Sequence, residues 1–534
     1  MKRRGRGKSI EPTLFGEESW TQPLDTKSME QMLWDAACQI RGEKDAPKFK
    51  DYILPLLFVK RLSDVFEDEL NRLSEEFGDL EVARELVEAD HQLVRFYIPS
   101  GCLWSEIRKT TTNIGQKLTD VVRAIAKANP TLQGVIDQVD FNATIHEERE
   151  ISDDALSRLI ESLSDLRYRL GLNDVEPDFL GRCYEYLLRK FAEDSGQSAG
   201  EFFTPKEVGW LIAHLMKPEQ GMECYDFACG SAGLLIKLQL WLEQRVGRPV
   251  PKPLRLYGQE LTASSFAIAR MNVIVHDMEC EIVRGDTIRN SKFLDNSSLK
   301  RFDIVVANPM WMQKNFETKL YEGDPFERFE WGYAPENTAD WAWVQHAYAS
   351  LKDTGRAAIV LDTGAVSRGS GNQGSNREKA IRKAFVDNDV IEGVILLPDN
   401  LFYNTSAAGI ILLLNRAKPA HLKGKIILIN ASEKFQKGRP KNFIPEESIT
   451  KIADAYHVVQ DMEKFVCVIT NEEAAANDYN LSPSRYIVTG AETEYREIPD
   501  LLAELATLEV EAAKLGGELK AIFEGRGIDG DLSR

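Results

Sequence analysis

Apolar positions between residues 29 and 192 recur every three or four residues, with charged residues between them. The segments "EQMLWDAACQI", "DYILPLLFVKRLSDVFEDELNRLSEEF" and "FLGRCYEYLLRKFAED" show this pattern. Such spacing is typical of amphipathic helices that bury one face. We therefore predict a helical domain over residues 29–192. A polar, flexible tail with several basic residues, 1–28, is expected to precede it.

The pattern changes after residue 192 to short runs that are almost continuously apolar. Seven such runs alternate with helical stretches, namely "MECYDF", "LRLYGQE", "CEIVRGD", "FDIVVAN", "RAAIVLD", "EGVILLP" and "AGIILLLN". Strands that are buried on both faces have this composition. The alternation predicts an α/β fold with a doubly wound, mostly parallel, seven-stranded sheet of the Rossmann type over residues 193–445.

The helical pattern returns in the C-terminal region, residues 446–534. From Ile498 onward, apolar residues alternate in steps of three and four, which is a heptad seam. The seam consists of Leu501, Leu505, Leu508, Ala512, Leu515, Leu519 and Ile522. We expect this helix to pack against another helix or a partner chain, and the alternative is an ordinary amphipathic helix on its own domain.

Charge and cysteine content narrow the function classes. The 66 Lys and Arg against 84 Asp and Glu give a net charge of −18, which repels polyanions. Any DNA contact must then be local or supplied by a partner. Two locally basic segments, 367–383 and 433–441, are candidates for such a contact and equally for solvated loops.

Seven scattered cysteines without a C-x-x-C pair indicate reduced thiols and no metal site. No apolar run approaches the roughly 20 residues of a membrane helix, so we expect a soluble, cytoplasmic protein.

A glycine-containing turn follows the first predicted strand. In "YDFACGSAGLL", Asp226 ends the strand, and Gly230 and Gly233 permit a tight turn with close approach of a ligand. We expect the amides of Ser231, Ala232 and Gly233 to face outward at a helix N-terminus. Ala232 fits there if its φ is negative. The spacing differs from the dinucleotide and P-loop motifs, so it indicates another nucleotide-type pocket.

Two further strands end in acidic residues. Glu260 ends "LYGQE", where a carboxylate can accept hydrogen bonds from ribose hydroxyls. Asp286 ends "VRGD" and could accept from an exocyclic amine such as that of adenine. Each acid alone is also typical of a solvated loop or a helix cap. Together with the glycine turn, three suitable strand ends in order favour a binding site.

The fourth strand ends in "DIVVANPMW". An adenine N6 amine is a poor nucleophile because its lone pair is delocalised into the ring. The Asn308 side-chain oxygen and the Pro309 carbonyl could each accept one N–H and localise that pair. Trp311 could offer a face on which an extruded base stacks. The alternative is that Asn-Pro simply ends the strand and Trp311 packs in the core.

These motifs resemble those of a known family. "DFACGSAG", "NPMW" and the upstream "GEFFTPKEV" (200–208) are similar, in that order, to the cofactor-binding, catalytic and N-terminal motifs of amino-methylating DNA methyltransferases. More closely, the chain resembles the modification (M) subunit of type I restriction-modification systems. That resemblance extends through "ADWAWVQHAYASLK", "LPDNLFYNTSAAGIILLLNR" and "YNLSPSRYI", and covers nearly all of the sequence.

The resemblance implies a Rossmann-like methyltransferase domain that uses S-adenosylmethionine to methylate adenine N6. It implies a catalytic turn of Asn308, Pro309 and Trp311, although Met310 stands where the family usually has a second proline. Glu260 would bind the cofactor ribose and Asp286 its adenine. The remaining implied cofactor-binding residues are Glu201, Phe202, Phe203, Thr204, Pro205, Lys206, Asp226, Gly230, Ser231, Ala232 and Gly233.

The resemblance also implies partners. In this family a separate specificity (S) subunit reads the DNA target, a second M subunit joins the complex, and the heptad helix is our candidate for docking on the S subunit. Whether a restriction (R) motor-nuclease subunit joins stays open. The alternatives are a self-sufficient methyltransferase acting on cytosine N4 or a protein glutamine, and a non-catalytic scaffold. Trp311 leaves the cytosine alternative open, whereas Asn308 favours adenine.

Overall fold

The structure is a computed structural model that separates into two compact units, residues 1–487 and 488–534. It describes residues 26–40, 50–137, 139–145, 148–175, 179–192, 204–247, 249–314, 316–371, 376–402, 405–439, 441–488, 507–508 and 514–515. In the second unit, Leu508 and Leu515 of the predicted heptad seam are helical and exposed. The rest of that helix and most of the predicted N-terminal tail lie outside the described residues.

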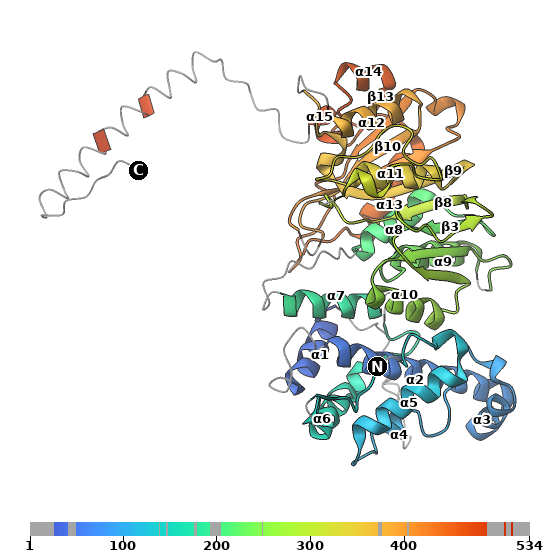
Figure 1. Ribbon diagram of the computed structural model, residues 1–534. Helices are drawn as coiled ribbons and strands as arrows, with labels where there is room; N and C mark the ends of the chain where they lie inside the picture. The colour runs from blue at the N-terminus through green and yellow to red at the C-terminus, as the bar shows by residue number, and fades with distance from the viewer. Residues whose placement is uncertain are drawn as a thin grey trace, which may run out of the picture. The chain divides into compact units, whose positions relative to one another are not determined.

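The N-terminal region is helical, as predicted (Figure 1). Its helices are α1 (Thr26–Gln39), α2 (Lys50–Phe77), α3 (Leu80–Ala89), α4 (Trp104–Ile107), α5 (Ile114–Ala128), α6 (Asp153–Leu163) and α7 (Phe179–Ala192), with one short hairpin of β1 (Thr144–Ile145) and β2 (Glu148–Arg149). Side-chain caps begin two of them: Asp79 accepts from the Val82 amide before α3, and Ser152 accepts from the Ala155 amide before α6.

The central sheet has nine strands in the order β13-β12-β10-β11-β9-β8-β3-β4-β5. They are β3 (Glu223–Asp226), β4 (Arg255–Glu260), β5 (Cys280–Arg284), β8 (Phe302–Ala307), β9 (Leu351–Asp362), β10 (Ile391–Leu396), β11 (Gly409–Asn415), β12 (Lys425–Asn430) and β13 (Val466–Thr470); a separate hairpin holds β6 (Leu294–Asp295) and β7 (Ser298–Leu299). All seven predicted runs form strands of this sheet.

Two strands were not predicted, so the expected number of seven is wrong. β12 and β13 extend the sheet beyond β10, and Ile427 lies opposite Val468 in their antiparallel pair. The expected end of the sheet domain at residue 445 therefore falls too early. β13 is a short edge strand whose side chains are partly exposed, which makes its apolar pattern weaker than that of the central strands.

Strand direction gathers the predicted motifs at one edge. β5, β4, β3, β8 and β9 run parallel to one another, whereas β11 is antiparallel to both β9 and β10. β12 is parallel to β10. The carboxyl ends of the parallel strands consequently share one edge, where open α/β sheets bind their ligands.

Helices cover both faces of the sheet, as a doubly wound fold requires. Ile304 and Val306 of β8 pack in the core shared with α8 (Lys206–Met216), α9 (Gly233–Val246), α10 (Ala263–Val275) and α13 (Glu446–Val458). The alternate residues Val305 and Ala307 pack in the opposite core, which includes residues of α11 (Asp340–Ala349), α12 (Arg377–Asp387) and α14 (Asn471–Ala476); Tyr486 of α15 (Pro483–Tyr486) packs against it. Within the described residues, none of the helices is long and apolar enough to cross a membrane.

Candidate active site

A pocket at the carboxyl edge brings together residues from three of the predicted motif segments. It lies between the start of α8, the turn that follows β3, the first turns of α9 and the end of β8. Its lining residues are Thr204, Asp226, Ala228, Cys229, Gly230, Ser231, Gly233, Leu234, Lys237 and Asn308. The predicted residues Glu201, Phe202 and Phe203 lie outside the described residues. Pro205 caps α8, and Lys206 is its first residue.

The turn after β3, residues 227–232, is called the glycine bend below. Gly230 has a φ of +52°, and its amide donates to Oε2 of Glu260 at 3.0 Å. Ala232 has a φ of +64°, so the condition of a negative φ, under which alanine would fit without strain, is not met. Its amide donates to the Cys229 carbonyl at 2.7 Å, which closes the bend and turns this amide inward rather than outward. A left-handed conformation costs an L-residue about 1–2 kcal/mol.

Close packing beneath the bend requires a glycine on the neighbouring strand. A Cβ at Gly258 of β4 would lie 2.9 Å from the Cys229 Sγ atom and 2.6 Å from Cδ1 of Ile282. The Cys229 amide also donates to the Gln259 carbonyl at 3.1 Å. The bend is therefore fixed against β4 by the hydrogen bonds of the Cys229 and Gly230 amides and by the absence of a side chain at Gly258.

The Asp226 carboxyl is buried, with the residue 1% exposed, and accepts from the Ala228 amide at 3.0 Å. Burial is the main cause that raises the pKa of Asp226 to about 8; the Ala228 hydrogen bond opposes this rise, and the nearby Glu260 carboxylate adds to it. A cation beside Asp226 would stabilise its ionised form. The pocket is thus suited to a positively charged ligand group.

Glu260, the last residue of β4, joins the glycine bend to Thr262, two residues after β4 ends. Besides the Gly230 amide, its carboxylate accepts from the backbone amide of Thr262 at 2.8 Å and from the hydroxyl of that residue at 3.1 Å. A carboxylate offers about four acceptor positions. These three hydrogen bonds leave about one position for a ligand hydroxyl.

Asp286 caps the turn after β5, as the alternative interpretation expected. Its Oδ1 atom accepts from the amides of Ile288 and Arg289 at 2.9 and 3.0 Å. The following residue, Thr287, donates from its hydroxyl to the Phe227 carbonyl at 2.6 Å. The Asp286 turn therefore lies directly beside the glycine bend, with one carboxylate oxygen, Oδ2, outside the capping bonds.

The Asn308 side chain is held from both sides. The Trp311 indole Nε1–H donates to the Asn308 Oδ1 atom at 3.0 Å. Because an indole N–H can only donate, this contact identifies the oxygen side of the amide. The Asn308 Nδ2 atom donates to the Thr204 hydroxyl at 3.1 Å. Two contacts from different segments thus fix the orientation of the amide at the pocket.

The expectation that Trp311 offers an open stacking face is wrong. The residue is 7% exposed and packs edge-on against Phe402, with ring centroids 4.6 Å apart. A Cβ at Gly409 would lie 2.9 Å from its Cη2 atom. The exposed apolar side chains of this turn belong instead to Met310, 39% exposed, and Met312, 48% exposed. Trp311 is in the core, as the alternative stated, and also orients Asn308.

Lys237 is a pocket residue that the sequence interpretation missed. It lies in the second turn of α9, is buried, and donates to the Gly233 carbonyl at 3.3 Å. Its stem crosses α8 so closely that a Cβ at Gly209 would meet the Lys237 Cδ atom at 2.5 Å. The signal was a lysine in the otherwise apolar run "GLLIKL".

The basic segment 367–383 is largely engaged within the fold. Arg382 is buried and donates to backbone carbonyls, including that of Tyr479. Lys379 pairs with Asp478 at 2.9 Å. The neighbouring cations Arg368 and Lys383 also have carboxylate partners. In the described part of this segment, which excludes residues 372–375, these four cations are therefore poor candidates for contact with DNA.

The second basic segment forms a hairpin after β12, with Gln436 paired to Phe443. Lys441 donates to the Asn400 side chain and the Thr405 carbonyl, both at 3.0 Å. These contacts join the hairpin to the loop whose Phe402 packs on Trp311. Two further cations of the hairpin, Lys437 and Arg439, are exposed.

This edge of the sheet has the parts of a methyltransferase that modifies an amino group. A tight bend and acidic strand ends suit a nucleoside-containing, positively charged cofactor, and the Asn-Pro turn supplies acceptors for an amine. The fold and the site together define that class.

Comparisons with known proteins agree with this class. The family described as N-6 DNA Methylase matches residues 175–495, and the HsdM N-terminal domain matches residues 29–163. The MjaVIII methylase subunit of a type I restriction enzyme from Methanocaldococcus jannaschii is 33% identical over 508 residues, which are 91% of this chain and 84% of that protein. The HindI methylase subunit from Haemophilus influenzae is 30% identical, over 78% of this chain and 94% of that protein. A crystal structure of a type I restriction-modification methyltransferase subunit from Streptococcus thermophilus has 28% identity and a TM-score of 0.69, and covers 87% of this chain and all of that one.

The chain belongs to the N-6 DNA methylase family, among the methylase subunits of type I restriction enzymes. It is accordingly an adenine-specific DNA methyltransferase.

Proposed function

We propose that this chain uses the Asn308–Trp311 turn to transfer the methyl group of S-adenosylmethionine to adenine N6 in duplex DNA. The observation that carries this assignment is the Asn308 amide, whose oxygen is oriented by Trp311 at 3.0 Å and which lines the same pocket as the glycine bend. An acceptor fixed in advance loses little free energy to reorientation during the reaction.

The donor set of the pocket fits S-adenosylmethionine. The buried Asp226 carboxyl suits the cofactor ammonium, since a bound cation offsets the burial that disfavours its charge. Gly230 presents no side chain to the pocket, and Glu260 and Asp286 would accept from ribose hydroxyls and the adenine amine. Thr204 lines the pocket on the upstream side, and Pro205 and Lys206, which follow it at the start of α8, would hold the cofactor with it. When bound, the cofactor supplies an electrophilic methyl group on a sulfonium.

Asn308 and Pro309 act on the substrate amine. One lone pair of the Asn308 oxygen is used by Trp311, which leaves the second for one N6–H. The Pro309 carbonyl accepts the other N6–H. Holding both hydrogens draws the nitrogen lone pair out of the ring toward the methyl group. As the N–C bond forms and the S–C bond breaks, the surplus N6 proton passes to solvent.

DNA and protein partners complete this proposal. A separate specificity subunit reads the target, a second copy of this chain joins the complex, and the heptad helix docks on the specificity subunit. Leu508 and Leu515 support this docking role, because exposed leucines at heptad positions favour burial against another helix. Lys437 and Arg439 are exposed on a hairpin connected to the catalytic turn, so we assign them to DNA phosphates.

The test compares Asn308→Ala with wild type in the complex reconstituted with the specificity subunit. Loss of the acceptor should lower kcat by about 10²–10³-fold while the Kd for S-adenosylmethionine stays within about twofold. Asn388→Ala, at the exposed end of α12, is the control. Nucleoside mass spectrometry should find N6-methyladenine. Wild-type turnover by Asn308→Ala, N4-methylcytosine as the product, or full activity of the isolated chain would contradict the proposal.

A further inference from the structure

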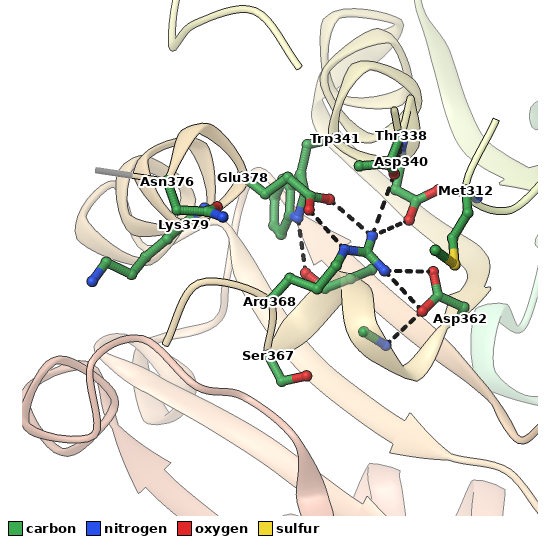
Figure 2. A network of polar contacts seen from close by, with 12 residues as sticks. Met312, Thr338, Asp340, Trp341, Asp362, Ser367, Arg368, Asn376, Glu378 and Lys379 are labelled. Carbon is green, nitrogen blue, oxygen red and sulfur yellow. Dashed lines mark hydrogen bonds and ion pairs between the residues drawn. The ribbon is translucent and has the colours of Figure 1, made fainter. Parts of the chain in front are cut away.

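Arg368, in the loop after β9, is surrounded by carboxylates from three elements (Figure 2). Its Nε and Nη2 atoms donate to Glu378 of α12 at 2.7 and 2.8 Å, and its Nη1 atom donates to both oxygens of Asp362 at 2.9 and 3.0 Å. Nη2 also pairs with Asp340, the first residue of α11. The fork of the guanidinium thus joins the end of β9 to the starts of α11 and α12.

Asp340 extends this network to the catalytic turn. Its Oδ2 atom faces Arg368, while its Oδ1 atom accepts from the Met312 amide at 3.0 Å (Figure 2). Met312 directly follows Trp311 and has a φ of +49°, which costs a non-glycine residue about 1–2 kcal/mol. The Asp340 hydrogen bond stabilises a conformation that the backbone otherwise disfavours.

The network has more negatively than positively charged groups, since three carboxylates share the single guanidinium of Arg368. Asp340 is fully buried. Burial, followed by the neighbouring Asp362, raises the pKa of Asp340 to about 7, and the Arg368 charge opposes that rise. Arg368 itself is closely held, because a Cβ at Gly364 would lie 2.4 Å from its Nη1 atom. Arg368 therefore both orients the Asp340 carboxylate and favours its ionised form.

We propose that Arg368 and Asp340 are positioning residues for methyl transfer: Arg368 orients Asp340, and Asp340 fixes the Met312 backbone and with it the Asn308–Trp311 turn. This inference rests on the proposed function. Asn308 is clamped on the pocket side by Thr204 and Trp311. The Asp340 hydrogen bond to Met312 secures the other end of the same turn. Both ends must hold for the Pro309 carbonyl and the Asn308 oxygen to face one amine together.

The test is a double-mutant cycle in the reconstituted complex. Asp340→Ala removes the acceptor of the Met312 amide and should lower kcat by about 10- to 100-fold, as small misplacements of catalytic groups do. Arg368→Lys keeps the charge but loses the fork, and should lower kcat by about 3- to 10-fold. The double variant should be no slower than Asp340→Ala alone, because Arg368 acts through Asp340. The Kd for S-adenosylmethionine should change less than twofold in all three.

Lys379→Met is the matched control. It removes an ion pair of the same helix, α12, that does not reach the catalytic turn, so kcat should stay at the wild-type value. Asp340→Asn adds a second check. Its single amide oxygen faces two N–H donors and can satisfy one of them, so its kcat should fall between those of wild type and Asp340→Ala.

Wild-type kcat in folded Asp340→Ala, or additive losses in the double variant, would overturn the inference. Thermal unfolding of each variant separates these results from a failure to fold, and the Asp340→Asn and Arg368→Lys variants test the inference if Asp340→Ala unfolds. Should Asn308→Ala also keep its rate, the proposed function itself fails. If Asn308→Ala is inactive while Asp340→Ala keeps the wild-type kcat, the positioning role is excluded and the proposed function is not affected.

Discussion

The two sides of the active site are built differently. The glycine bend is held mainly by contacts to the adjacent strand β4, where Gly230 donates to Glu260 and Cys229 donates to the Gln259 carbonyl. The catalytic turn is held by segments that are not strands of the sheet: Asn308 contacts Thr204, just before α8, and Met312 contacts Asp340, the first residue of α11. Cofactor binding thus depends on neighbouring strands, whereas catalysis depends on how the starts of α8 and α11 pack against the catalytic turn.

Their charges differ as well. The acids Asp226 and Glu260 lie beside the bend, at the ends of β3 and β4, while the turn offers the neutral Asn308 amide and two exposed methionines. Substitutions at the bend should therefore change the cofactor Kd, and substitutions at the turn should change kcat.

Among these substitutions, Asp226→Asn should give the largest difference between its effect on the cofactor Kd and its effect on kcat. Losing a charge-assisted contact of about 1.5–3 kcal/mol should raise the Kd for S-adenosylmethionine about 10- to 100-fold at pH 8, with kcat at saturating cofactor nearly unchanged. Isothermal titration calorimetry measures this. 5′-Methylthioadenosine, which lacks the amino acid group, should bind both proteins equally. A lowered kcat with an unchanged Kd would contradict the claim that this side of the site serves cofactor binding rather than catalysis.

The same residue predicts a pH dependence. Because the pKa of Asp226 is raised to about 8, the protein must release a proton before the carboxylate can hold an ammonium. Affinity should therefore rise by up to tenfold per pH unit between pH 6 and 8. Folding stability has the opposite trend: the contribution of this group is full below about pH 4 and is lost as the pH rises through about 8. Asp226→Asn should remove both dependences, and an unchanged slope would contradict the assignment.

We expect the hairpin after β12, which carries Lys437 and Arg439, to contact DNA rather than the cofactor. The double substitution Lys437→Gln and Arg439→Gln should weaken DNA binding by about tenfold and reduce the salt slope by nearly 2, without altering cofactor affinity. Fluorescence anisotropy at several salt concentrations measures the slope. Lys423→Gln, at the opposite end of β12, is the control. An unchanged slope would remove the hairpin from the DNA interface.

Trp311→Phe keeps an aromatic ring against Phe402 but loses the indole N–H that orients Asn308. A neutral hydrogen bond of about 0.5–1.5 kcal/mol corresponds to a decrease in kcat of roughly 2- to 10-fold. Single-turnover methylation measures this. Trp241→Phe, in the core on the same side of the sheet, should leave kcat unchanged. Equal rates for Trp311→Phe and wild type would mean that the N–H does not assist catalysis.

The smallest effect is expected at Ala232. Ala232→Gly relieves about 1–2 kcal/mol of left-handed strain, and the greater freedom of glycine in the unfolded chain offsets about 0.4–1 kcal/mol of that. We expect the free energy of unfolding to rise by about 0.5 kcal/mol in denaturant titrations. A loss of 1 kcal/mol or more would show that the buried methyl group outweighs the strain.

Short-range patterns predicted much of this molecule. Continuous apolar runs identified the strands that end at Asp226, Glu260 and Ala307, and parallel order brought the following motifs to one edge. β12 was overlooked although "KIILIN" has the same pattern, and β13 is a partly exposed edge strand. The conformation of Ala232 could not be predicted, because strain there depends on how tightly the bend closes.

The other features that the sequence did not predict depend on contacts between residues far apart in the chain. The sequence does not show that Trp311 turns inward against Phe402, 91 residues away, or that Arg368 leaves a polar segment to enter a carboxylate cluster. Both facts depend on which strands are neighbours in the sheet. Asp340 carried a signal, since it lies in "ADWAWVQH", but its contact with Met312 required the tertiary structure.

The most direct test of the central claim, that Trp311 and Thr204 act through Asn308, is a set of single-turnover rates. Trp311→Phe and Thr204→Val are measured in the wild-type and Asn308→Ala backgrounds, with the cofactor saturating. We predict that each substitution slows methyl transfer in the wild-type background and has no further effect once Asn308 is alanine. Equal losses in both backgrounds would contradict the account.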